Sequence, residues 1–202
     1  MAQIKNTAFE VRVSNGPFNM LENITGIFHN TSQETEICSA GFLVKRTTQV
    51  PNEGYTGINN DNTWYMEAAV AADLVTTPIF ACNPYQVNQI QDGANGNVFK
   101  VGANTLGLAL PKGEFGTFTH IVFDGMHVYR FGIGNLSAAI STNKFFTIAN
   151  GLLVPAAAAP TTDAAPYFEL VGTGTFTEGP MASFAYYDVV AKQVMADTAS
   201  EG

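Results

Sequence analysis

The stretch Phe118–Phe131, FTHIVFDGMHVYRF, decides the expected fold. Strand-like residues flank Asp124-Gly125, a pair that tolerates the positive φ which a two-residue hairpin turn requires. This turn fixes the register, so Ile121 is expected to face Val128 across the ribbon. Since both faces of the ribbon are substantially apolar, the sequence predicts a central hairpin that is covered on both sides.

A second hairpin is predicted at Phe145–Pro155, FFTIANGLLVP, where Asn150-Gly151 turns the chain and Ile148 meets Leu153. Pairing is expected to stop at the final proline, which has no amide hydrogen to donate. Period-two patterns bounded by polar turns predict further strands over residues 9–13, 41–46, 64–69, 78–82, 98–101, 167–171, 173–177 and 182–190.

These strands predict an all-β fold, a sandwich or barrel built from antiparallel hairpins with little helix. Two stretches could be helical: residues 67–75, EAAVAADLV, and the tail over residues 189–199. Residues 1–14 are interpreted as an N-terminal arm and residues 15–202 as a β domain. The domain has room for two lobes joined near residues 155–166, PAAAAPTTDAAP, where the flanking prolines favour an extended connector.

Charged residues make up only 13% of the 202 residues, and the formal net charge is −8. An acidic balance without basic runs excludes the usual route to nucleic acid, in which lysine and arginine side chains neutralise phosphates. Residues 1–8 lack the apolar core of a signal peptide, and no apolar stretch has the length needed to cross a bilayer. We therefore expect no secretion, no nucleic-acid partner and no membrane partner.

Candidate catalytic and metal-ligating residues are few. Cys38 and Cys82 are interpreted as reduced, buried thiols. His120 and His127 share one face of the first predicted hairpin, where they could bind a metal with Asp124 or serve a hydrolase, but packing at a sheet face is the favoured interpretation. The oxygen-rich stretches 59–62 and 92–97 lack the acid spacing of a calcium loop and are interpreted as turns. No metal and no cofactor are expected, and an enzyme is the least favoured class.

A long loop rich in asparagine and glycine is predicted over residues 47–63, TTQVPNEGYTGINNDNT. Loops of this length in a compact domain are usually functional or disordered. Tyr55, Asn59 and Trp64, in or beside this loop, are candidates for a binding contact. The aromatic rings among them keep a glycan-binding β-sandwich open as an alternative function.

The stretches AFEVRVSNGPF, NGLLVPAAAAP and FTEGPMASFAYYDV stand in a weakly charged β chain without a signal sequence. In this the chain resembles the capsid decoration proteins of tailed bacteriophages, also called cement or head auxiliary proteins, and the similarity covers most of its length in style. The resemblance implies a non-enzymatic virion structural protein that is made in the bacterial host cytoplasm and binds across capsomers on the capsid exterior. A tail or head-fibre component is the alternative within this class.

The same resemblance implies the major capsid protein as a partner and a homo-oligomer, with a trimer favoured. In that group an N-terminal arm often becomes ordered by joining capsid-protein strands. Phe9, Val11 and Val13 alternate with polar residues in the matching region, and they are therefore the predicted capsid contacts. An ordinary first strand of the domain is the alternative that these residues leave open.

Overall fold

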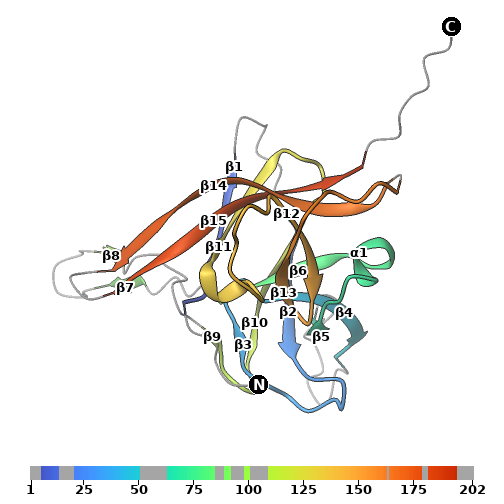
Figure 1. Cartoon of the computed structure of the whole chain (residues 1–202). Coiled ribbons are helices and arrows are strands. Elements are labelled where there is room, and N and C mark those ends of the chain that lie inside the picture. The colour runs from blue at the N-terminus through green and yellow to red at the C-terminus, as the bar shows by residue number, and fades with distance from the viewer. Residues whose placement is uncertain are drawn as a thin grey trace, which may run out of the picture.

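The computed structural model describes residues 6–13, 21–50, 63–84, 89–91, 98–100, 109–162, 164–178 and 182–194. Their backbone forms a closed five-stranded barrel, a six-stranded sheet and two small two-stranded sheets (Figure 1). In this part of the chain the helical structure consists of α1 (Asp73–Thr76) and the 3-10 turn η1 (Ile133–Asn135). The predicted all-β class is therefore confirmed.

The barrel closes in the order β10-β2-β5-β4-β6, and β2 and β5 run parallel while the other neighbours run antiparallel. Its strands are β2 (Asn23–Phe28), β4 (Leu43–Gln49), β5 (Thr63–Ala68), β6 (Ile79–Asn83) and β10 (Phe115–His120). Because side chains alternate along a strand, one set turns inward. Phe28, Phe80 and Phe118 belong to the buried cluster that this set forms, and the ring of Phe42 meets that of Phe28 edge-on at 5.5 Å.

The six-stranded sheet is antiparallel throughout, in the order β1-β11-β15-β14-β12-β13. Its strands are β1 (Phe9–Val13), β11 (His127–Gly132), β12 (Phe145–Ala149), β13 (Leu152–Ala156), β14 (Pro166–Glu178) and β15 (Ala182–Gln193). The sheet packs against the outside of the barrel, where Leu43 and Ile79 share a buried cluster with Tyr129, Phe131 and Phe168. The barrel and the sheet share this cluster, which we call the joint core.

The remaining strands are short. β3 (Cys38–Ser39) pairs with β9 (Ala109–Leu110), and β7 (Gln89–Gln91) pairs with β8 (Val98–Lys100). No helix in the described part of the chain has the length and apolar character that crossing a bilayer requires.

A buried asparagine ties the sheet to the barrel. The side-chain oxygen of Asn135 accepts hydrogen bonds from the backbone N–H of Ala8 at 3.0 Å and of Gly132 at 3.1 Å. Its amide donates to the backbone oxygen of Ala40 at 2.7 Å. Gly41 follows with φ +72°, and a Cβ there would meet the Asn135 amide at 2.8 Å, so this position requires glycine.

The predicted hairpin over residues 118–131 is wrong. Its two arms are strands of different sheets: β10 pairs with β2 and β6, and β11 pairs with β1 and β15. Each arm thus has both of its edges occupied by strands distant in sequence. The segment between them crosses from the barrel to the sheet, where the backbone N–H of Ile121 donates to Ile79 and that of Val122 donates to the Tyr129 hydroxyl.

The hairpin over residues 145–155 is confirmed, with Ile148 opposite Leu153. Asn150 and Gly151 both have positive φ, as a type I′ turn requires. The pairing does not stop at Pro155, which lies opposite Phe146, and it continues to Ala156. A proline is tolerated there because β13 is an edge strand.

Other segments differ in the structure from their predicted boundaries or conformation. Residues 167–171 and 173–177 form a single strand, β14, with an irregularity between Leu170 and Gly172 rather than a break. Of the stretch 67–75, which could be helical, residues 67–68 end β5 and residues 73–75 begin α1, so most of it is not helical. Residues 157–165 join β13 to β14 of the same sheet. The sequence prediction missed β2, because Asn23 and Gly26 suggest turns. Glycine stands at position 26 of this strand because a Cβ there would lie only 2.5 Å from the Met66 side chain.

Candidate binding surface

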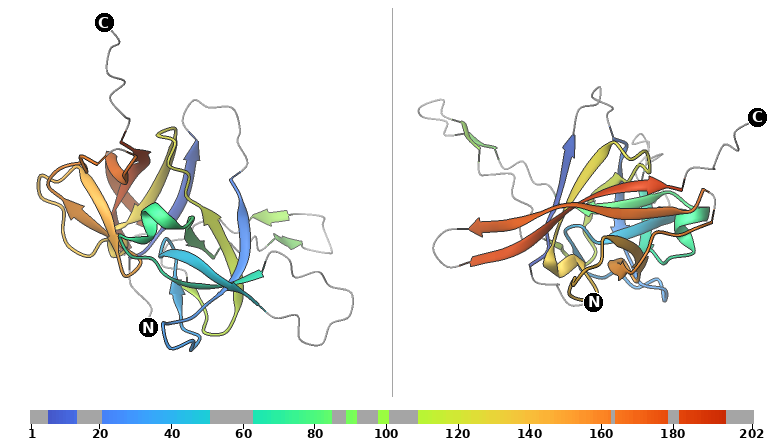
Figure 2. Two further views of the ribbon diagram at one scale, coloured as in Figure 1. Left: turned by 90° about the vertical axis from the view of Figure 1, so that its right-hand side faces the viewer. Right: turned by 45° about the horizontal axis from the view of Figure 1, so that its top comes forward.

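The distal part of the β14–β15 hairpin extends beyond the rest of the sheet (Figure 2). β14 has 13 residues and β15 has 12, and both neighbouring strands pair with them over shorter stretches. β12 pairs with β14 only at Phe168 and Glu169, and β11 reaches no further along β15 than Tyr186. Residues 175–178 and 182–185 therefore form a two-stranded ribbon, and residues 172–174 lead into it along the edge of β14 that β12 leaves unpaired. We call residues 172–178 and 182–185 the projecting hairpin.

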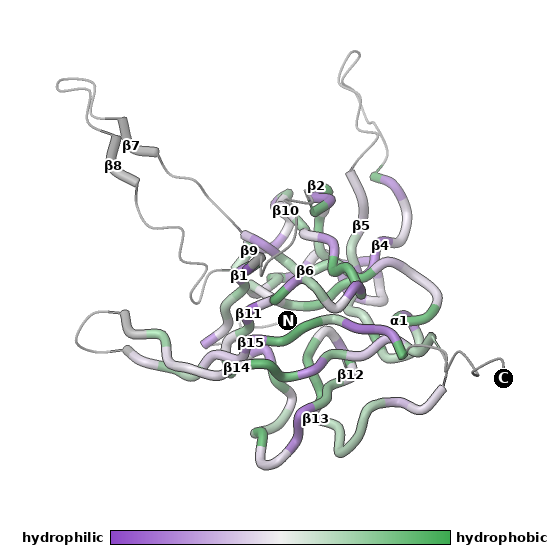
Figure 3. Tube along the Cα trace, turned by 90° about the horizontal axis from the view of Figure 1, so that it is seen from above, coloured by the Kyte–Doolittle hydropathy of each residue, from purple (hydrophilic) through white to green (hydrophobic). Residues whose placement is uncertain are grey.

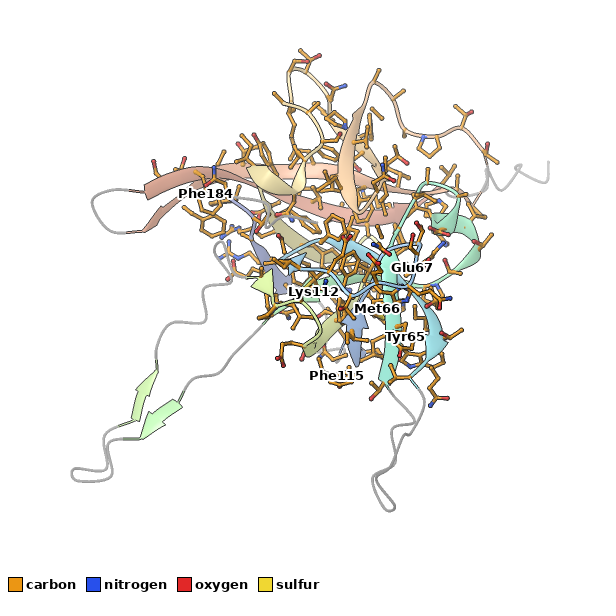
Figure 4. The ribbon with its side chains drawn as sticks, turned by 90° about the horizontal axis from the view of Figure 1, so that it is seen from below. Tyr65, Met66, Glu67, Lys112, Phe115 and Phe184 are labelled. Carbon is orange, nitrogen blue, oxygen red and sulfur yellow. The ribbon has the colours of Figure 1, made fainter. Side chains whose placement is uncertain are left out.

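Aromatic rings cover one face of the projecting hairpin and its base. The ring centroids of Phe176 and Phe184 lie 5.3 Å apart, and those of Phe176 and Tyr186 lie 4.9 Å apart. The Tyr186 ring lies directly over Gly174, where a Cβ would collide with it. Figure 4 shows Phe184 on the hairpin, well away from Met66 in the barrel. This packing stiffens a ribbon beside which the structure describes no further strand.

An arginine anchors the base of the projecting hairpin to β11. The Arg130 guanidinium makes a bidentate ion pair with Asp188, with N···O distances of 2.7 and 2.8 Å, and contacts Glu10 of β1 at 3.3 Å. Its Cζ lies 3.7 Å from the ring centroid of Tyr186. The hydrogen bond to Asp188 raises the pKa of Arg130 further above its high ordinary value. Three neighbouring strands thus hold the base in place.

The opposite face of the projecting hairpin carries small polar side chains. Thr173, Thr175 and Ser183 are exposed, and Figure 3 shows the distal ends of β14 and β15 in pale colours that are neither strongly hydrophilic nor strongly hydrophobic. A cleft of about 550 Å³ lies between this face and residues 140–144. Among the described residues that line it, Lys144 is the one with a charged side chain. The face thus presents exposed polar side chains beside the cleft, as suits contact with another surface.

The predicted arm residues lie in the chain's own sheet. Phe9 is 2% exposed, and its ring stacks on that of Tyr129 with the centroids 6.3 Å apart. Val11 packs partly buried against the same core, and Val13 lies opposite His127 in the pairing of β1 with β11. This is the ordinary first strand that the residues left open. A capsid contact through this strand stays a prediction.

Of the predicted loop contacts, Tyr55 and Asn59 lie outside the described residues, and Trp64 lies at the start of β5. Trp64 packs against the barrel core, and the Arg46 guanidinium covers its ring at 5.0 Å. One face of this ring is therefore occupied by a side chain of the protein itself.

The structure separates the two histidines considered for a metal site. His120 ends β10 and contacts Phe80, with 5.2 Å between the ring centroids. His127 begins β11, and its Nδ1 lies 2.7 Å from the Asp124 carboxylate. Among the described residues, no group of three or more histidine, cysteine or acidic side chains is placed to hold a metal ion. The calcium candidates at residues 59–62 and 92–97 lie outside the described residues.

Cys38 and Cys82 are both buried and unbonded to each other, in agreement with the predicted free thiols. The Cys82 thiol lies 3.5 Å from the backbone oxygen of Cys38. Burial raises the pKa of Cys38 well above its ordinary value, and the side-chain hydrogen bond that it shares with Cys82 adds to this effect. A thiol held protonated in this way is a poor nucleophile.

Sequence reasoning missed the projecting hairpin as a candidate site. Its alternation, Thr173-Gly174-Thr175-Phe176, indicates a strand with one threonine face, but nothing local says where the neighbouring strands end. No protein-family model, curated protein or solved structure matches the chain. The fold and surface therefore define a class only: an all-β protein with a stiffened, projecting two-stranded hairpin.

Proposed function

We propose that the protein is a non-enzymatic structural protein of a bacteriophage particle, a decoration protein that binds the major capsid protein on the capsid exterior, in trimeric form. The observation that carries the proposal is the projecting hairpin, with one face stiffened by aromatic rings and the other exposed and polar. Such an element supplies a preorganised surface, so less ordering entropy is lost when it binds a neighbouring subunit.

The contact surface in this proposal is the threonine face, with the cleft beside residues 140–144. Phe9 is buried in the joint core, so β1 contributes to the fold, and as the terminal strand of the sheet it offers a capsid strand only the edge that lies away from β11. The threonine face of the hairpin, in contrast, presents exposed side chains directly. The low charged fraction of 13% supports the proposal, because burying a surface with few charged side chains in an assembly requires little desolvation of ions.

The test begins with labelling of particles of the virus that encodes the chain. Gold-labelled antibodies against the purified protein should mark the outside of the head in electron micrographs. Label confined to the tail or to head fibres would replace decoration by the alternative virion role. Particles that carry none of the protein would overturn the proposal.

A pair of matched variants then tests the surface. Thr173→Lys with Thr175→Lys places two charges on the threonine face, and binding to undecorated particles is expected to weaken about tenfold or more. Thr25→Lys with Thr117→Lys is the control, since these exposed threonines lie opposite each other on the barrel exterior. Equal binding by the two folded variants would exclude the hairpin as the contact.

A further inference from the structure

One end of the barrel gathers polar and aromatic side chains that face inward. β2, β5 and β6 begin at this end, and β4 and β10 finish there. Three side chains each stand two residues along a strand from a member of the barrel core, and so share its inward direction: Arg46 from Val44, Trp64 from Met66 and His120 from Phe118. We call this group the barrel mouth.

The indole of Trp64 has an unsatisfied donor. Its Nε1 is buried and has no hydrogen-bond partner among the residues that the structure describes. An indole N–H can only donate, and a buried donor without an acceptor destabilises the state that contains it. Because most buried polar groups in proteins are paired, this atom indicates a missing acceptor at the barrel mouth.

The neighbouring guanidinium likewise has no acceptor in the described part of the chain. The Cζ of Arg46 lies 5.0 Å from the centre of the Trp64 ring, and the side chain is half-buried. The ion pairs of the described residues include none with Arg46, although the net charge of the chain is −8. Arginine offers several N–H donors in a planar fork that matches carboxylate and phosphate oxygens.

His120 stands at the third side of the barrel mouth. Its Nδ1 lies 3.9 Å from a carboxylate oxygen of Glu22, whose side chain is largely exposed. Burial lowers the pKa of His120, the Glu22 charge opposes this, and the positive charge of Arg46 lowers the pKa further. The influence of Arg46 agrees with the strand directions, which bring the guanidinium and the imidazole to the same end of the barrel.

We propose that the barrel mouth binds a small oxyanion, a carboxylate or a phosphate group, which accepts hydrogen bonds from the Arg46 guanidinium and the Trp64 indole N–H. Both groups are donors only, so a neutral donor or a cation cannot satisfy them. An oxyanion supplies acceptors for both and neutralises the guanidinium in a partly buried setting, where a charge-assisted hydrogen bond is strongest. The inference does not depend on the proposed capsid function.

Trp64 is the only tryptophan of the chain, so tryptophan fluorescence, excited at a wavelength that tyrosine does not absorb, reports this site alone. The full chain is titrated with sodium phosphate and, separately, with sodium acetate, at constant ionic strength maintained with sodium chloride. We expect a saturable change in fluorescence with at least one anion. Saturation by phosphate alone indicates a tetrahedral oxyanion, saturation by acetate alone indicates a carboxylate, and saturation by both indicates a site for either.

Arg46→Gln should weaken the saturating anion about tenfold or more, since one charged partner is lost. Arg12→Gln is the matched control, because Arg12 is exposed and lies on β1, and it should bind like the unaltered chain. In Trp64→Phe, which lacks the indole donor, the anion should raise the thermal unfolding midpoint by less than in the unaltered chain. A linear response to both anions, or equal affinity in Arg46→Gln, would overturn the proposal.

Discussion

At Asn150-Gly151 both residues have positive φ, 47° and 78°, and the chain returns as β13 beside β12. At Asp124-Gly125 only the glycine has positive φ, 72°, and the chain passes from the barrel to the sheet. At the second turn, the side chain of the first residue also takes part in hydrogen bonds. Asp124 accepts hydrogen bonds from the backbone N–H of Met126 at 2.8 Å and of His127 at 3.2 Å, which fix the entry into β11.

Both turns are also held by their surroundings. The N–H of Gly151 donates to the Ala69 oxygen at 2.8 Å, and its oxygen accepts from the N–H of Leu43 at 2.9 Å, so the first turn is docked on the barrel. The N–H of Gly125 donates to the Ala191 oxygen of β15 at 2.9 Å. A turn sequence thus permits a hairpin, and the partners available to the flanking strands decide whether it forms.

The largest effect is expected for Gly151→Ala. An alanine at this position would have to adopt the same positive φ, and its Cβ would collide with the buried Phe42 ring. We expect a loss of about 3 kcal/mol in the free energy of unfolding, since left-handed backbone and overpacking each cost roughly 1–2 kcal/mol. Chemical denaturation measures it. A loss below about 1 kcal/mol would mean that the docking of this turn on the barrel is loose.

Asp124→Ala comes next. It removes two hydrogen bonds to backbone N–H groups and the 2.7 Å contact with the His127 ring. The expected loss is about 2 kcal/mol in the free energy of unfolding, because the two N–H groups lose their acceptor at a partly buried site. Asp124→Asn is the control, since its side-chain oxygen can still accept and should recover much of the loss. No loss in Asp124→Ala would show that the partners of the strands alone direct the crossing.

Gly125→Ala separates backbone strain from crowding. Its φ of +72° resembles that of Gly151, but a Cβ there meets only the flexible Lys192 side chain, at 3.5 Å. The expected loss is about 1 kcal/mol, the cost of the left-handed backbone alone. Denaturation under the same conditions as for Gly151→Ala gives the comparison. Equal losses in the two variants would show that the collision with Phe42 adds nothing to the cost of Gly151→Ala.

The smallest effect concerns acid, to which only the Asp124 turn should respond. Burial raises the pKa of Asp124, but hydrogen bonds from Met126 and His127 outweigh it and hold the pKa below its ordinary 3.8. The carboxylate therefore contributes stability above about pH 3.8 that is lost as the pH falls through the lowered value. The stability difference between the unaltered chain and Asp124→Ala should narrow on acidification, as measured by denaturation at each pH. A constant difference would contradict this.

The sequence alone predicted the fold class and the β12–β13 hairpin, because Asn150-Gly151 and its neighbours are local. It could not predict the partners of β10 and β11, since Thr119 pairs with Asn23 and Phe131 pairs with Phe9, residues that lie far away in the sequence. Pattern within a strand says which face is buried and nothing about which strand lies beside it. The projecting hairpin was missed for the same reason.

One residue of the barrel mouth, Trp64, was predicted from the sequence, as a loop contact. Arg46 and His120 were not linked to Trp64, because they lie on β4 and β10 and meet it only when the barrel closes. The unsatisfied Nε1 is a property of that packing and has no sequence signal.

The interleaved order of strands bears on how the chain folds as it is made. The barrel strands come from one continuous stretch, residues 23–120, whereas the sheet takes β1 from before it and its other five strands from after it. At about 5–20 residues per second, synthesis leaves β1 without its partner β11 for on the order of ten seconds. The barrel needs β10, which ends at residue 120, and β11 begins at residue 127, so the barrel becomes able to close just before β1 gains its partner. The sheet is completed only when β15, the last of the described strands, emerges and inserts between β11 and β14.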